Sequence, residues 1–291
     1  MSSPPMTSPQ QGIPQHSWGK LMAVCGPALR PGGLKLTEQA LEQCAFPQGA
    51  VLIDAGCGLG ESLKLFTARG FRAIGIDSDP KILKSCDSNA QTILASLDDM
   101  PLESNTADGI FCECVLNLVG SRKRALAEFW RVLKDNGLLV YSDLIAQGSI
   151  DNPDNTKSPA RNDTSLIHKN PKGPKNQDDN LANGSCLKGA ITAPEILSLL
   201  IGGGFKIISA KDCLAELNSL AAALVWAYGR EGLNELCNLG GGLGGNLEGG
   251  LGSSPNSDPN SDLGGDLSYP KRPMSYLMVI AAKEPRENQK L

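Results

Sequence analysis

The stretch VLIDAGCGLG at residues 51–60 constrains the fold most. An apolar run ends in Asp54, and three glycines follow within five positions, at Gly56, Gly58 and Gly60. In an open parallel sheet, ligands bind beyond the carboxyl ends of the strands, where a strand hands over to its helix. Glycines at such a turn permit close backbone approach and positive φ, and the helix N-terminus offers free N–H groups. We therefore expect a ligand to lie against this turn.

Short apolar segments alternate with helical patterns through the first half of the chain. The alternation predicts strands at 50–55, 72–77, 92–95, 108–115 and 137–145, with helices at 61–69, from Asp79-Pro80, and at 121–134. Further along, it predicts a helix at 193–204, a strand at 205–212, a helix at 217–236 and an edge or closing strand at 274–284. This order is typical of an α/β fold, a mostly parallel sheet covered by helices on both faces.

The remaining segments differ in composition. Residues 1–17 are rich in Pro, Ser and Gln and are expected to be a flexible tail. Residues 148–185 are polar and rich in turn formers, and residues 239–268 are dominated by Gly, Asn, Asp and Ser. Both are interpreted as mobile insertions. The sequence thus predicts one domain over 18–291 that carries two insertions.

Charge and apolar content narrow the classes of partner. The chain has 27 Lys and Arg against 31 Asp and Glu, a formal charge of −4, and no basic stripe, so nucleic acid is not an expected partner. No segment approaches the roughly 18–20 apolar residues that cross a bilayer, and no export signal is evident, so we expect a cytoplasmic protein with no membrane contact. The nine cysteines are odd in number and irregular in spacing, which argues against a disulfide framework. The oligomeric state is left open.

A second acid favours a nucleoside ligand. Asp77 ends the second predicted strand, at a spacing from Gly56 that places its carboxylate beside a ribose bound over the turn. A nicotinamide or flavin dinucleotide is less favoured, because Glu61 would direct a negative charge toward a pyrophosphate.

Four motifs together carry a family resemblance. VLIDAGCGLG, GIDSDPKIL, MPLESNTADGIF and EFWRVLKDNGLLVYSDL resemble the successive motifs of class I methyltransferases that use S-adenosylmethionine (SAM). The resemblance implies a Rossmann-like fold with a seven-stranded, mostly parallel sheet whose last strand is antiparallel. It also implies SAM as cofactor, with the glycine turn at the methionine part and Asp77 at the ribose hydroxyls. The full set of cofactor-binding residues implied is Asp54, Gly56, Cys57, Gly58, Gly60, Asp77, Ser78, Leu97, Asp98 and Glu113.

The chain departs from the family pattern at one motif. The segment ASLDDMP has Ser96 where the family often has the acid that lies near the adenine. Either Asp98 substitutes for that acid or the adenine contact is weaker.

A second, looser resemblance concerns the methyl acceptor. The segment CECVLNLV resembles the corresponding stretch of arsenite methyltransferases and places Cys114 on a matching cysteine. AVCGPALRPGG and GSCLKGAITAPEIL supply Cys25 and Cys186 in the same way. The resemblance implies that these three thiols bind trivalent arsenic as the methyl acceptor, and thiolates suit such a thiophilic centre. No resident metal ion is expected, since His16 and His168 lack metal-ligand spacing.

Two alternatives remain open. One is a methyltransferase for a small organic O, N, S or C acceptor, similar to quinone-biosynthesis enzymes, in which Tyr141, Asp143 and Glu113 orient the acceptor. The other is a SAM-binding accessory protein without turnover. The remaining six cysteines are interpreted as small core residues.

Overall fold

The structure is a computed structural model that describes residues 18–147, 189–238 and 274–285 of the 291-residue chain. For residues 18–20, 25 and 230–238 only the backbone is described. The predicted N-terminal tail, both predicted insertions, Cys186 and the two histidines lie outside the described residues.

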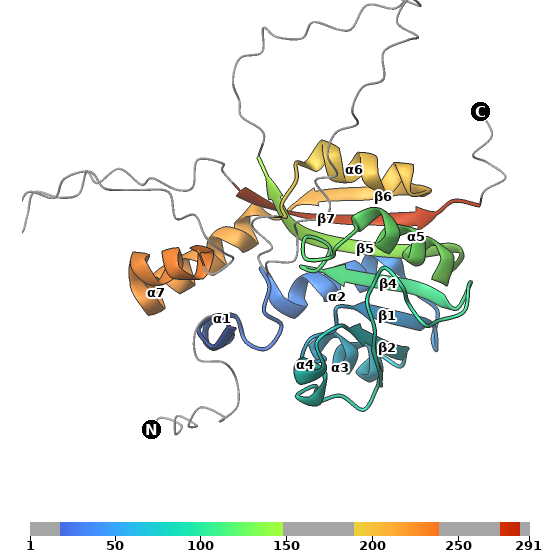
Figure 1. Cartoon of the computed structure of the whole chain (residues 1–291), viewed down its shortest axis with the longest axis horizontal. Helices are drawn as coiled ribbons and strands as arrows, with labels where there is room; N and C mark the ends of the chain where they lie inside the picture. Colours follow the sequence, from blue (N-terminus) through green and yellow to red (C-terminus); the bar gives the residue numbers. More distant parts are fainter. Residues whose placement is uncertain (1–17, 148–188, 239–273, 286–291) are drawn as a thin grey trace, which may run out of the picture.

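The described residues form one seven-stranded sheet in the order β3-β2-β1-β4-β5-β7-β6 (Figure 1). Strands β1 to β5 are parallel, and β7 is antiparallel to both of its neighbours. This confirms the Rossmann-like, mostly parallel sheet with an antiparallel last strand. The strands are β1 (Val51–Ala55), β2 (Arg72–Asp77), β3 (Gln91–Leu94), β4 (Ala107–Glu113), β5 (Leu133–Ala146), β6 (Phe205–Asp212) and β7 (Met274–Lys283).

The expectation of an edge position for the last strand is wrong. β7 lies between β5 and β6 and pairs with both, so β6 takes the edge of the described sheet. The burial pattern explains the difference, because β7 is buried along nearly its whole length while β6 alternates between partly buried and exposed side chains. A strand that is covered on both faces reads as a continuous apolar run.

The helices begin where the sequence places their caps. At α4 the Asp79 carboxylate accepts hydrogen bonds from the backbone of Lys81 and Ile82, and at α6 Thr192 and Glu195 form a capping box. Helices α1 and α2, ahead of the first strand, had no counterpart among the predicted elements. The helices are α1 (Trp18–Cys25), α2 (Gly33–Cys44), α3 (Glu61–Ala68), α4 (Pro80–Lys84), α5 (Arg122–Val132), α6 (Ala193–Gly202) and α7 (Leu214–Asn238), which is kinked at Gly229.

Two cores cover the two faces of the sheet. Successive side chains of a strand point to opposite faces, and neighbouring residues of the central strands accordingly divide between the cores. Ile110, Leu139 and Val279 pack with α5 and α6, whereas their chain neighbours pack with α2 and α3. The helices of both layers hold the carboxyl ends of β1, β2, β4 and β5 at one edge, where the predicted site residues lie.

Candidate cofactor and acceptor site

The turn after β1 requires glycine for two different reasons. Gly56, Gly58 and Gly60 have φ values of 83°, 53° and 85°, in the left-handed region that favours glycine. A Cβ atom on Gly56 would lie 2.3 Å from the Val115 side chain, and one on Gly60 would lie 2.5 Å from the Cys86 sulfur. A Cβ atom on Gly58 would meet nothing within 4 Å. Two of the glycines therefore serve packing, and the third leaves backbone exposed to open space.

Asp77 lies beside this turn, as the sequence predicts. One of its carboxylate oxygens accepts a hydrogen bond from the backbone N–H of Gly58 at 3.0 Å, and the other accepts one from Asp79 at 2.9 Å. A carboxylate has about four acceptor sites. Two backbone donors therefore fix the orientation of Asp77 and leave it capacity for the hydroxyl groups of a ligand.

Asp54 is a buried carboxylate that lacks a contacting cation. It is 5% exposed at the end of β1, and within the described residues its carboxylate makes no hydrogen bond or ion pair. Burial raises the pKa of Asp54 to about 7; the positive charge of Arg30 opposes this rise, and the charges of Glu113 and Asp77 add to it. A positively charged ligand group would stabilise the ionised form.

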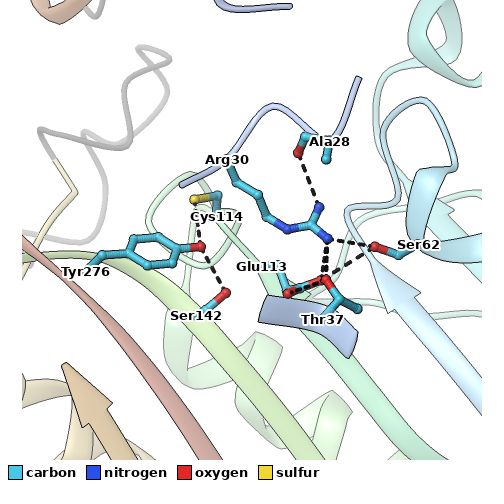
Figure 2. Close-up of polar contacts among 8 residues, drawn as sticks. All are labelled: Ala28, Arg30, Thr37, Ser62, Glu113, Cys114, Ser142 and Tyr276. Atoms are coloured by element: carbon cyan, nitrogen blue, oxygen red, sulfur yellow. Dashed lines mark hydrogen bonds and ion pairs between the residues drawn. The ribbon is translucent and has the colours of Figure 1, made fainter. Parts of the chain in front are cut away.

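A buried polar network that the sequence analysis missed joins Arg30, Thr37, Ser62 and Glu113 (Figure 2), and the charges of Arg30 and Glu113 act on Asp54. The Arg30 guanidinium nitrogen Nη2 lies 2.9 Å from Glu113 Oε2 and donates to the hydroxyls of Thr37 at 2.6 Å and Ser62 at 2.9 Å. The Thr37 hydroxyl in turn lies 3.0 Å from both Glu113 oxygens. Removing one partner of such a buried pair typically costs 3–5 kcal/mol, because the other charge is left uncompensated. Glu113, predicted to bind the cofactor, thus has protein partners for both oxygens.

The Arg30 side chain retains donor capacity. Its Nη1 donates to the Ala28 carbonyl oxygen at 3.2 Å, and its Nε, although buried, has no hydrogen-bond partner within the described part of the chain. Burial by itself lowers the pKa of Arg30, but the negative charge of Glu113 and the weaker effects of three other neighbours raise it by more. The guanidinium is therefore a buried, permanently charged donor next to the glycine turn. The local signal for it is the stretch LRPGGLKLT at residues 29–37, in which Leu29 and Gly32 adopt positive φ around Arg30.

The remaining predicted cofactor residues lie near the same edge with different exposures. Asp98 accepts a hydrogen bond from the Ser96 hydroxyl at 2.5 Å and pairs with Arg124 at 2.7 Å. The Ser96 bond and the Arg124 charge lower the pKa of Asp98, against the effect of burial. The side chains of Leu97 and Cys57 are buried, and burial raises the pKa of the Cys57 thiol well above its usual range. Any ligand contact of these two residues is thus through backbone, whereas Ser78 is exposed.

Cys114 lies at the predicted acceptor side. It follows the last residue of β4, has a φ of 58° although it is not glycine, and is partly exposed. Its sulfur lies 3.3 Å from the Tyr276 hydroxyl, which lies 3.0 Å from the Ser142 hydroxyl (Figure 2). The side chain of Cys25 and the whole of Cys186 are outside the described residues, so convergence of the three thiols stays a prediction.

The three strand residues considered as acceptor-orienting groups are buried. Asp143 is fully buried and accepts hydrogen bonds from the backbone of Asn117 and Leu144, and burial raises its pKa to about 7. Tyr141 is 1% exposed and Glu113 is 7% exposed. Contact of these three residues with an acceptor stays a prediction. Among the described residues, no three His, Cys, Asp or Glu side chains are grouped to hold a metal ion, and no helix is long and apolar enough to cross a membrane.

Comparison with known proteins relates part of the chain to a family. Residues 53–141 match the family model described as "Methyltransferase domain". This part of the chain is similar to a methyltransferase domain. A malonyl-[acyl-carrier protein] O-methyltransferase from Serratia marcescens is 30% identical over 112 residues, which cover 38% of this chain and 44% of that protein. The chain spans about half the length of the curated relatives it matches.

Solved structures of other proteins share the fold of this chain. The [4+2]-cyclase SpnF superimposes with a TM-score of 0.56 at 16% identity, covering 94% of this chain and 85% of that chain. A Haemonchus contortus phosphoethanolamine N-methyltransferase 2, in complex with phosphomonomethylethanolamine and S-adenosylhomocysteine, gives a TM-score of 0.59 at 11% identity, covering 91% and 56%. At these identities the likeness concerns the fold alone.

Proposed function

We propose that this protein binds SAM over the carboxyl ends of β1, β2 and β4 and transfers its methyl group to a small acceptor. The observation that carries the proposal is the buried, unpaired Asp54 carboxylate near Asp77, whose own carboxylate is oriented by the open backbone of Gly58. A ligand with a cationic end and a ribose matches these groups, and SAM has both.

Each group has a distinct role in holding the cofactor. The bare Gly58 backbone allows close approach, and Asp77 accepts hydrogen bonds from the ribose hydroxyls. Asp54 attracts the ammonium and sulfonium charges, while the spare N–H donors of Arg30 suit the carboxylate of the methionine part. When bound, SAM supplies a methyl group activated by its positive sulfur. The chain's task is then to hold a nucleophile about 3–3.5 Å from that methyl group, in line, with water excluded.

For the acceptor, we propose trivalent arsenic held by the thiolates of Cys114, Cys186 and Cys25. The partial exposure of Cys114 at the end of β4 supports this choice, since soft thiolates bind thiophilic centres. A small organic acceptor is the alternative, and the three residues proposed to orient it, Tyr141, Asp143 and Glu113, are buried.

A product assay tests the proposal. The full-length protein is incubated with methyl-labelled SAM and, in separate reactions, with arsenite plus a thiol or with a panel of small phenols, amines and thiols. We expect labelled product and S-adenosylhomocysteine in at least one reaction, and Cys114→Ser should abolish the arsenite product while SAM still binds. Tight SAM binding without product from any acceptor would contradict catalysis and favour an accessory protein.

A further inference from the structure

The acceptor side contains a chain of three polar side chains from three neighbouring strands. Cys114 follows β4, Ser142 belongs to β5 and Tyr276 to β7, and in the sheet these strands are adjacent. Tyr276 is fully buried and Ser142 is 1% exposed, whereas Cys114 is partly exposed. The sulfur is therefore the end of the chain that faces outward.

Burial and protonation indicate which of these three side chains donates each hydrogen bond. Burial, followed by the charges of Cys114 and Glu113, raises the pKa of Tyr276 well above its usual range, so its hydroxyl keeps its proton. Within the described residues, the buried Ser142 hydroxyl has Tyr276 as its side-chain partner. A buried hydroxyl hydrogen needs an acceptor. Either atom of each pair can donate, and these two conditions favour the arrangement in which Ser142 donates to Tyr276 and Tyr276 donates to the Cys114 sulfur.

The backbone of Cys114 is itself strained. Cys114 adopts a left-handed conformation, which a residue with a side chain adopts only where the surroundings enforce it. The Cys114 backbone N–H donates to the Ser142 carbonyl oxygen at 2.7 Å. Strand β5 therefore holds Cys114 as well as Ser142, the two ends of this row of three side chains. Leu29, next to Arg30, is left-handed as well. Such strain collects at functional sites more often than elsewhere.

We propose that Tyr276 is a positioning residue that, supported by Ser142, holds the Cys114 sulfur as a hydrogen-bond acceptor and so favours its thiolate at the acceptor side. This inference rests on the proposed function for its purpose, but not for its test. A thiolate is the form that binds a thiophilic acceptor or takes a proton from an acidic one.

Several titratable groups of the described residues interact with Cys114 besides the hydrogen bond from Tyr276. Arg30, Tyr141 and Tyr276 interact electrostatically with Cys114, and Glu113 precedes it in the chain. The charges of Arg30 and Glu113 largely offset each other, because the two groups form an ion pair 2.9 Å apart. Tyr141 is neutral, since burial raises its pKa well above the usual range, and its buried hydroxyl has no hydrogen-bond partner within the described residues. Among these described groups, the Tyr276 hydroxyl is the one that contacts the Cys114 sulfur by a hydrogen bond, and its removal tests the proposal.

The test is the rate of Cys114 alkylation by iodoacetamide between pH 6 and pH 10, followed peptide by peptide by mass spectrometry in the full-length protein without SAM. Only the thiolate reacts, so the midpoint of the pH profile reports ionisation and the plateau reports access. In Tyr276→Phe the midpoint should rise by about one pH unit, with alkylation at pH 7 about tenfold slower. Ser142→Ala should give a smaller rise in the same direction.

The chain supplies a matched control. Tyr141→Phe removes a buried hydroxyl from the neighbouring strand that has no described partner, and it should leave the Cys114 profile within twofold of the parent. The partly exposed Cys86 provides an internal reference. An unchanged midpoint in Tyr276→Phe would overturn the proposal, as would an equal change at Cys86. Failure of the parent to bind SAM by calorimetry would instead count against the proposed function and leave this result standing.

Discussion

At the scale of single residues, Asp54 links cofactor binding to pH. Its pKa of about 7 means that the carboxyl is largely protonated below pH 7 in the free protein. A cationic ligand favours the carboxylate, so binding below pH 7 must release a proton. The affinity for SAM should therefore fall as the pH drops below 7, by up to about tenfold per pH unit.

Calorimetry at pH 6 and pH 8 measures this dependence, and buffers of different ionisation enthalpy count the protons released. Asp54→Asn should bind more weakly at pH 8 and lose most of the pH dependence. The assignment fails if the parent and this variant respond equally to pH, because another group must then titrate.

The buried ion pair of Glu113 with Arg30 predicts how a substitution changes the free energy of unfolding. Glu113→Ala should lower the free energy of unfolding by about 3–5 kcal/mol, because it leaves the Arg30 charge buried without its partner. Denaturant titration measures the loss. Glu103→Ala, at an exposed carboxylate just ahead of β4, should change stability by no more than about 0.5 kcal/mol. Equal effects of the two substitutions would show that the pair does not hold the segment before α2.

At the scale of elements, two glycines of the turn between β1 and α3 are expected to differ in role: one serves packing and the other ligand binding. Gly56→Ala forces a Cβ atom against Val115 at a φ of 83°, so it should destabilise the fold. Gly58→Ala places its Cβ atom in open space, so it should cost only about 1–2 kcal/mol for its left-handed backbone, less than Gly56→Ala, but should obstruct a ligand that approaches the backbone. Thermal unfolding and SAM titration of both variants distinguish the two effects. Equal SAM affinity of Gly58→Ala and the parent would contradict the placement of the ligand.

The same elements show what the sequence pattern can and cannot predict. Asp54, the glycine turn and Asp77 were found because their signals are local: a strand, a turn and the end of the next strand. The roles of Arg30 and Tyr276 could not be found in this way. Arg30 acquires its partner from the end of β4, and Tyr276 lies 162 residues from Cys114 in the chain. The position of β7 inside the sheet also depends on pairing that periodicity does not encode.

At the scale of the whole molecule, the two halves of the sheet differ in how far they resemble known proteins. The family match over residues 53–141 runs from β1 into β5 and contains the glycine turn, Asp77 and Cys114. Arg30 and Tyr276 lie outside it, on the segment before α2 and on β7. Because a shared fold does not determine the substrate, the family match supports the proposed cofactor side, and the acceptor remains to be identified by experiment.

The most direct test of the cofactor placement is a calorimetric titration of SAM into the parent, Asp77→Ala and Glu42→Ala proteins at pH 8. Asp77→Ala removes the carboxylate that is oriented at the glycine turn, whereas Glu42 is exposed on α2. The account predicts one site in the parent, the same affinity in Glu42→Ala, and an affinity about tenfold to hundredfold weaker in a folded Asp77→Ala, as expected for the loss of hydrogen bonds to a charged group. Equal affinity in all three proteins, or no binding in the parent, would contradict it.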